Sequence, residues 1–287
     1  MNIKRITRLC ACVGLAMVCS ISFAQDRKEP RIALTLGEVH DELLVTVNNG
    51  RTQRALLTIL KDSKPTHILV AHSNDGLIGL VGYPQLTGTN RNAPLIRARH
   101  LFVSDNIALV QFECPRDTQN ECQDQYRRSP DLGNDVNVLL EMVKKKVAFT
   151  KVSHIGHLGG AVNAVALAKS GNVDSVVLLA PPDPYEQRAN FTGARIFQEV
   201  QLKDLKSKVL VVAHEDTECK IADYENSERL AKGVAFVTVK GYSAIDQASR
   251  APCANLGRHG FIGREREVGF ATLNFIEGIG TPPREIR

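Results

Sequence analysis

The side chains best suited to acid–base or nucleophilic chemistry lie in short polar segments that follow apolar runs. His259 could act as a general base, with Asp216 as the acid that orients it. His72 and Ser73 follow another apolar run, where Ser73 could be a nucleophile with His72 or His259 as its base. The plainer interpretation of this second segment is a polar turn built on Asn-Asp-Gly.

Histidines recur where the apolar runs end, and this raises a second kind of chemistry. His72, His157, His214 and His259 could converge on a metal ion or form a basin that titrates near neutral pH. The chain has no H-E-x-x-H motif, and the alternative is that these histidines are scattered loop residues. We predict no metal ligand and no cofactor, and we keep metal binding as a third hypothesis.

The spacing of apolar residues predicts the strands that would position these side chains. Leu43–Val47 and Ala55–Leu60 alternate between apolar and polar residues, and Asn48-Asn49-Gly50 between them predicts a hairpin. Short, β-branched runs then predict strands buried on both faces. These runs are His67–Ala71, Ile107–Phe112, Val152–Ile155, Val176–Leu179, Val209–Ala213 and Phe236–Val239.

Helical patterns separate the later strands. They cover Pro130–Lys146, Gly160–Ser170, Asp223–Lys232 and Arg264–Ile276. A hairpin followed by alternating strands and helices predicts an α/β fold, with a doubly wound, mostly parallel sheet and an N-terminal β-hairpin. In such sheets the working site lies beyond the carboxyl ends of the strands, where the polar segments fall.

One strand-to-helix junction has the pattern of a nucleophile elbow. Gly156 and Gly160 frame a tight turn between an apolar strand and an Ala-rich helix. In an elbow of this kind the central residue sits on a strained turn, with the strand and helix backbones pressed close together. Leu158 occupies that central position here.

The C-terminal half carries the matching segments. They are His214-Glu215-Asp216-Thr217-Glu218-Cys219, then Pro252-Cys253, then His259-Gly260-Phe261 before the last helix. Together with the elbow, they resemble a group of bacterial exported α/β-hydrolases over about Leu43 to Ile276. The resemblance implies an α/β-hydrolase fold with the chain order nucleophile, acid, histidine.

The same resemblance implies that the catalytic set is incomplete. Leu158 has no heteroatom, so it cannot attack an acyl carbon as a serine would. Counting back from Cys219, Thr217 falls at the acid position and Asp216 lies one residue early. His259 is retained. The candidate residues of the surrounding pocket or oxyanion site are His72, Ser73, His157 and Gly159.

The N-terminus predicts export. Residues 1–24 combine early cations, an apolar core and Ser22-Phe23-Ala24, so we expect a signal peptide cleaved before Gln25 and one α/β-hydrolase-like domain over residues 25–287. The four cysteines that remain, an even number in an exported chain, predict two disulfides. Of the three pairings that four cysteines allow, we favour Cys114–Cys122 with Cys219–Cys253 over a metal site, which lacks a C-x-x-C pair.

Charge and hydropathy narrow the partners. The net charge is +5, and loss of the three signal cations would leave about +2, with both signs interspersed. This does not favour nucleic acid as a partner. After the signal, no apolar segment is long enough to span a membrane.

Three hypotheses follow. The first is a periplasmic or secreted α/β-hydrolase-like pseudoenzyme that binds a small acyl-type ligand or a partner protein. The second is an active hydrolase that uses His259 with Asp216 and either Ser73 or a water molecule. The third is a metal-binding periplasmic protein.

Overall fold

The structure is a computed structural model that describes residues 30–48, 50–74, 76, 78–84, 89–115, 122, 124–187, 193–241 and 252–287. The predicted signal peptide lies outside the described residues, as do Asn49 and Asp75 of the two predicted turns. Within the described ranges, no helix is both long enough and apolar enough to cross a membrane.

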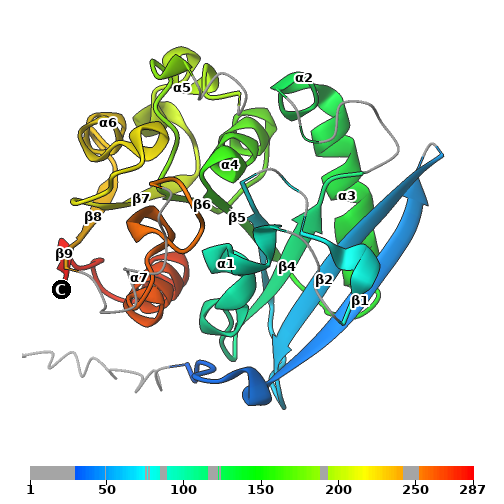
Figure 1. Ribbon diagram of the computed structural model, residues 1–287. Coiled ribbons are helices and arrows are strands. Elements are labelled where there is room, and N and C mark those ends of the chain that lie inside the picture. The colour runs from blue at the N-terminus through cyan, green and yellow to red at the C-terminus, as the bar shows by residue number, and fades with distance from the viewer. Residues whose placement is uncertain are drawn as a thin grey trace, which may run out of the picture.

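The described strands form one nine-stranded sheet in the order β1-β2-β4-β3-β5-β6-β7-β8-β9 (Figure 1). Their bounds are β1 Val39–Asn48, β2 Arg51–Leu60, β3 His67–His72, β4 Ile107–Glu113, β5 Lys151–His157, β6 Ser175–Leu179, β7 Lys208–His214, β8 Ala235–Val239 and β9 Glu285–Ile286. β1 pairs antiparallel with β2, and β2 pairs antiparallel with β4. Every other pairing is parallel, which confirms the predicted hairpin and the mostly parallel sheet.

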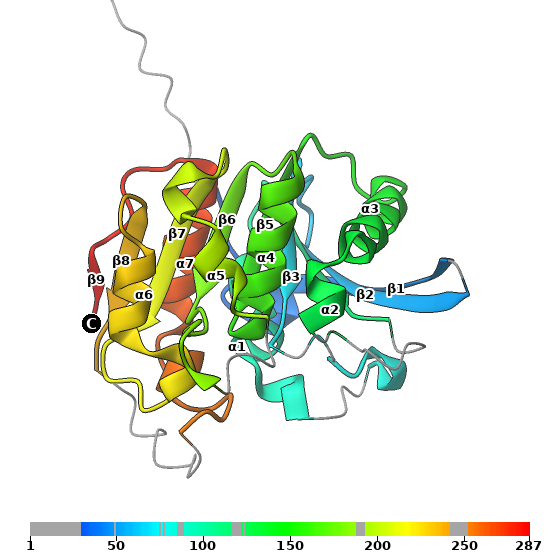
Figure 2. The ribbon, with the colours of Figure 1, turned by 90° about the horizontal axis from the view of Figure 1, so that it is seen from above.

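Helices cover both faces of the sheet. Their bounds are α1 Pro94–Arg97, α2 Asp124–Arg128, α3 Pro130–Lys144, α4 Gly159–Ser170, α5 Ile196–Glu199, α6 Tyr224–Leu230 and α7 Glu265–Glu277. Figure 2 shows α3, α4 and α6 on one face of the sheet, with α7 and α1 on the other. This is the doubly wound arrangement that the alternating pattern predicts.

The core follows from the two-residue period of the buried strands. In β6, Val177 and Leu179 pack on the α7 side of the sheet, whereas Val176 and Leu178 pack on the α4 side. Strands β3 and β4 are buried along their whole length, as expected of strands covered on both faces.

The structure differs from the sequence pattern mainly at element ends and in short elements. β5 runs on to His157, two residues past the predicted end, and α6 is shorter than the predicted Asp223–Lys232. α1, α2, α5 and β9 were not predicted. Each has five residues or fewer, which is too short for apolar periodicity to build up.

Candidate functional site

The elbow is a tight turn between β5 and α4, and its backbone is strained. Leu158 has φ 49° and ψ −122°, a conformation that residues with a Cβ atom rarely adopt. A Cβ atom on Gly156 would collide with the backbone of Gly160, and one on Gly160 would collide with the carbonyl of His72. The two glycines therefore allow helix α4 to lie directly against strands β3 and β5.

The side chain of Leu158 is packed rather than open to solvent. It is 3% exposed and belongs to the apolar cluster on the α7 side of the sheet, together with Ala180, Cys219 and Phe261. The described residues form four pockets away from this point, and none has Leu158 or His259 in its lining. Apolar packing therefore occupies the place where the fold carries its nucleophile.

The backbone N–H that follows the elbow is already bound within the protein. Gly159 donates this N–H to the Asn74 side-chain oxygen at 3.1 Å. In the α/β-hydrolase fold, the N–H of the residue after the nucleophile is one of the donors that stabilise an oxyanion. Here Asn74, from the loop after β3, takes the position of that anion.

A buried arginine holds the loops around Asn74 and the elbow. The Arg127 guanidinium, 2% exposed, donates to the Asn74 carbonyl at 2.6 Å, the Cys122 carbonyl at 2.6 Å and the Asn163 side-chain oxygen at 3.0 Å. It also donates to the Gly159 carbonyl. These contacts tie the β3 loop, helix α2 and the first turn of α4 together.

His157 and His259 stack as a buried pair beside the elbow. Their ring centroids are 5.6 Å apart with the planes 7° from parallel, and His157 Nε2 donates to the His259 carbonyl at 3.2 Å. Burial lowers the pKa of His157 well below its ordinary value. Burial, and next the positive charge of Arg97, lowers the pKa of His259 to about 4, although the Pro252 carbonyl opposes this effect. His259 is thus a neutral imidazole at neutral pH.

The predicted acid does not meet this histidine. Asp216 is exposed, its N–H donates to His214 Nδ1 at 3.2 Å, and its carbonyl accepts from Arg258 at 2.9 Å. Thr217, the alternative acid position, is half-buried and bonds the Cys219 N–H at 3.3 Å. Among the described residues, no hydrogen bond or ion pair joins a carboxylate to His259.

Arg97 lies close enough to His259 to act on its charge instead. This arginine pairs with Glu265 at 2.9 Å and donates to the carbonyls of Asn255 at 3.0 Å and Gly260 at 2.5 Å. It thereby holds the loop that carries His259 against the start of α7. An adjacent cation disfavours the imidazolium that a general base must form.

The remaining candidate residues lie in a second buried cluster on β3 and β5. His72 Nε2 lies 2.9 Å from His154 Nδ1, with the rings stacked 5.2 Å apart, and burial lowers the pKa of both. Ser73 is buried beside His72, and among the described residues no hydrogen bond connects it to His259. Ser153 is paired with His67 at 2.8 Å inside the sheet.

Both disulfides form in the predicted pairing. Cys114 joins Cys122 with 5.7 Å between Cα atoms, and Cys219 joins Cys253 with 4.7 Å. The first packs against Gly76 in the loop after β3. The second connects the turn after β7 to the segment that leads to His259. The bridges thus hold the two loops that flank the elbow.

The sequence pattern missed the residues that set the electrostatics of this site. Arg127 lies in the short helix α2 and Arg97 in the short helix α1, so no periodic pattern marked either. Asn74 stood within the predicted turn without a role. The described residues contain no group of three His, Cys, Asp or Glu side chains arranged to hold a metal ion.

The fold has solved counterparts, and all of those compared here share little sequence with this chain. An αβ serine hydrolase homologue from Coxiella burnetii is 16% identical, with 83% of this chain and 97% of that chain covered at a TM-score of 0.52. A fungal esterase structure from Rhizomucor miehei is 12% identical, covering 85% and 86% at 0.53. A protein of unknown function from Agrobacterium tumefaciens, named as a candidate α/β hydrolase, is 13% identical, covering 84% and 100% at 0.55.

No protein-family model matches the chain, and no curated protein matches its sequence. The nine-stranded mixed sheet, its flanking helices and these structural neighbours show that the chain has the α/β-hydrolase fold.

Proposed function

We propose that this chain is an exported α/β-hydrolase-fold protein that has lost serine-hydrolase activity and acts by binding, with a small acyl-type ligand or a partner protein as its target. The observation that carries the proposal is the elbow itself. Leu158 adopts the strained elbow backbone, yet its side chain is buried in the core and offers no nucleophile.

Two further features support the loss of turnover. The Gly159 N–H that would stabilise an oxyanion is bound to Asn74. The charges that act on His259 come from Arg97 and His214 and not from a carboxylate. An active hydrolase at this place would therefore need changes at three separate points.

Export is supported by the two disulfides, since such bridges persist in oxidising compartments. The predicted signal peptide would direct the chain there, which makes the periplasm or the cell exterior its location. Purification from a periplasmic extract with Gln25 as the first residue would support this part of the proposal, whereas an uncleaved cytosolic chain would contradict it.

The catalytic part is tested by restoring the missing nucleophile. We expect Leu158→Ser to hydrolyse a panel of short- and medium-chain nitrophenyl esters no faster than the unchanged chain does. The reason is that Asn74 and Arg97 leave the restored serine without an oxyanion donor and without an effective base. Circular dichroism should confirm that the variant is folded. A rise of 100-fold or more above background would show that the remaining machinery is intact and would contradict the proposal.

A further inference from the structure

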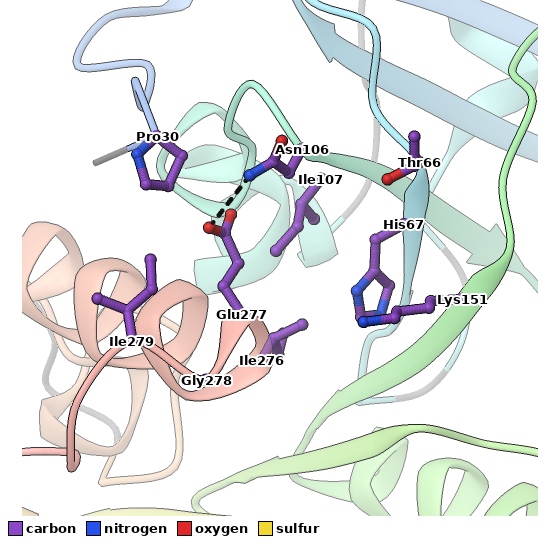
Figure 3. Close-up of a pocket in the computed structure, with 10 residues that line it drawn as sticks. All are labelled: Pro30, Thr66, His67, Asn106, Ile107, Lys151, Ile276, Glu277, Gly278 and Ile279. Atoms are coloured by element: carbon purple, nitrogen blue, oxygen red, sulfur yellow. Dashed lines mark hydrogen bonds between the residues drawn. The ribbon is translucent and has the colours of Figure 1, made fainter. Parts of the chain in front are cut away.

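A pocket of about 480 Å³ opens at the edge of the sheet opposite to the elbow. Its walls include the first residues of three neighbouring strands, His67 of β3, Ile107 of β4 and Lys151 of β5, whereas the elbow follows the last residue of β5. The end of helix α7 closes the other side (Figure 3). The volume is in the range common for small-molecule sites.

The pocket has a cation on one wall. Lys151 is exposed, and among the described residues it takes part in no ion pair or hydrogen bond. Its neighbour His67 is neutral, because burial lowers the pKa of His67 to about 4 and Nε2 is paired with Ser153. The nearby Asp174 carboxylate accepts the Val152 backbone N–H at 2.9 Å. Lys151 is therefore the cation available to a ligand.

The opposite wall has a carboxylate in an unfavourable place. Glu277 is the last residue of α7, and the last turn of this helix contains no basic residue. The C-terminal end of a helix carries partial negative charge, so an anion there is destabilised and a cation is stabilised. Ser104 Oγ donates to Glu277 at 2.6 Å and Asn106 Nδ2 at 3.4 Å, which hold the carboxylate at the pocket (Figure 3). A positively charged ligand group would offset both the charge and the helix end.

The surface between these two charges is apolar. Ile107 and Ile276 are buried parts of the core, and Ile279 is a half-buried residue just beyond α7. All three line the pocket. A ligand that fits this surface has an aliphatic body with charges of opposite sign at its two ends.

We propose that this pocket binds a small aliphatic zwitterion, namely an aliphatic amino acid or dipeptide, with its ammonium group at Glu277 and its carboxylate at Lys151. The site lies at the far edge of the sheet from Leu158. It therefore does not depend on whether the elbow is catalytic, and ester turnover would leave this inference standing.

Isothermal titration calorimetry on the full mature chain tests the inference, with L-leucine and L-alanyl-L-leucine as the probes. The matched controls are 4-methylpentanoate, which lacks the ammonium group, and 3-methylbutylamine, which lacks the carboxylate. We expect saturable one-to-one binding of at least one zwitterion, at least about tenfold tighter than either control, because each charged contact contributes roughly 1.5 kcal/mol or more. No saturable binding, or equal binding of a singly charged control, would overturn the inference.

Variants place the binding in this pocket. Lys151→Met and Glu277→Gln should each weaken binding of the zwitterion by about tenfold or more. Glutamine retains an acceptor for Ser104 and Asn106, and thermal melting should show that both variants are folded. Lys64→Met, which changes an exposed lysine outside the pocket lining, should leave the affinity unchanged. Unchanged affinity in Lys151→Met and Glu277→Gln would overturn the assignment.

Discussion

At the scale of the residue, Leu158 combines two properties that rarely occur together. Its backbone has the positive φ that fits glycine, and its side chain is buried like that of any core leucine. Positive φ at a non-glycine residue costs of order 1–3 kcal/mol, and such strain persists only where the surroundings impose it. Here apolar packing around the side chain compensates for a backbone conformation that belongs to the elbow.

The strain at Leu158 predicts an unusual order of stability. Leu158→Ala should lower the free energy of unfolding by about 2–5 kcal/mol through lost packing. Leu158→Gly loses at least as much packing but removes the strain, so it should be no less stable than Leu158→Ala. Urea denaturation of both variants measures the difference.

Leu179 in β6 provides the matched control, because it is equally apolar and fully buried in a regular strand. There the glycine variant should be less stable than the alanine variant by about 0.5–1 kcal/mol. The same order at both positions would show that the elbow backbone is not strained.

Buried histidines give the chain a defined response to acid. The pKa of His67 is lowered to about 4, that of His154 to about 3 and that of His259 to about 4, with burial as the largest cause in each case. In the unfolded chain a histidine has a pKa near 6.5. Below this pH the unfolded state therefore binds more protons than the folded state, so acid favours unfolding.

We predict that the free energy of unfolding falls as the pH is lowered from 6.5 to 5. The slope should reach up to about 1.4 kcal/mol per pH unit for each buried histidine, and stability should be flat just above pH 7. Urea midpoints across this range measure the slope. His40→Gln, which changes an exposed histidine, should leave the slope unaltered. Stability that is constant or rises toward pH 5 would contradict this prediction.

At the scale of the element, the long strands and helices follow from the sequence, and the loops that carry the electrostatics do not. The apolar runs that form β3 to β8 and the stripe of α3 are local signals, and the structure confirms these elements. Arg127 and Asn74 acquire their roles only when β3, α2 and α4 come together. No local pattern encodes such contacts between segments distant in the chain.

The same reason explains why the acid position could not be decided from the sequence. Asp216 and Thr217 are adjacent, and only the course of the turn after β7 shows that the Asp216 side chain is exposed. The elbow, in contrast, was recognisable, because the spacing of Gly156 and Gly160 reports a close approach of two backbones within one segment.

Arg127 should be an important stabilising residue of the loops around the elbow. Arg127→Met would leave several buried carbonyl oxygens without their donor, so we expect a loss of about 2–4 kcal/mol in the free energy of unfolding. Arg128→Met is the matched control, since the neighbouring Arg128 is partly exposed and pairs with the exposed carboxylate of Glu199. That variant should lose about 1 kcal/mol or less. Equal losses from both variants, measured by urea denaturation, would argue against the role of Arg127.

At the scale of the whole molecule, the sheet separates two edges with different properties. The carboxyl edge keeps the backbone of an elbow and fills it with Leu158, while two disulfides hold the loops beside it. The amino edge carries the pocket between Lys151 and Glu277. A fold shared with hydrolases thus presents its chemically open pocket away from the place where they react.

The central claim is that the native chain has no serine able to react as a hydrolase nucleophile. Incubation of the folded, unmodified chain with a fluorophosphonate probe, followed by intact mass analysis, tests this claim most directly, with an active serine esterase as the positive control. The account predicts the mass of the unlabelled chain, while the esterase is labelled completely. Stoichiometric labelling of this chain at Ser73 or any other serine would contradict it.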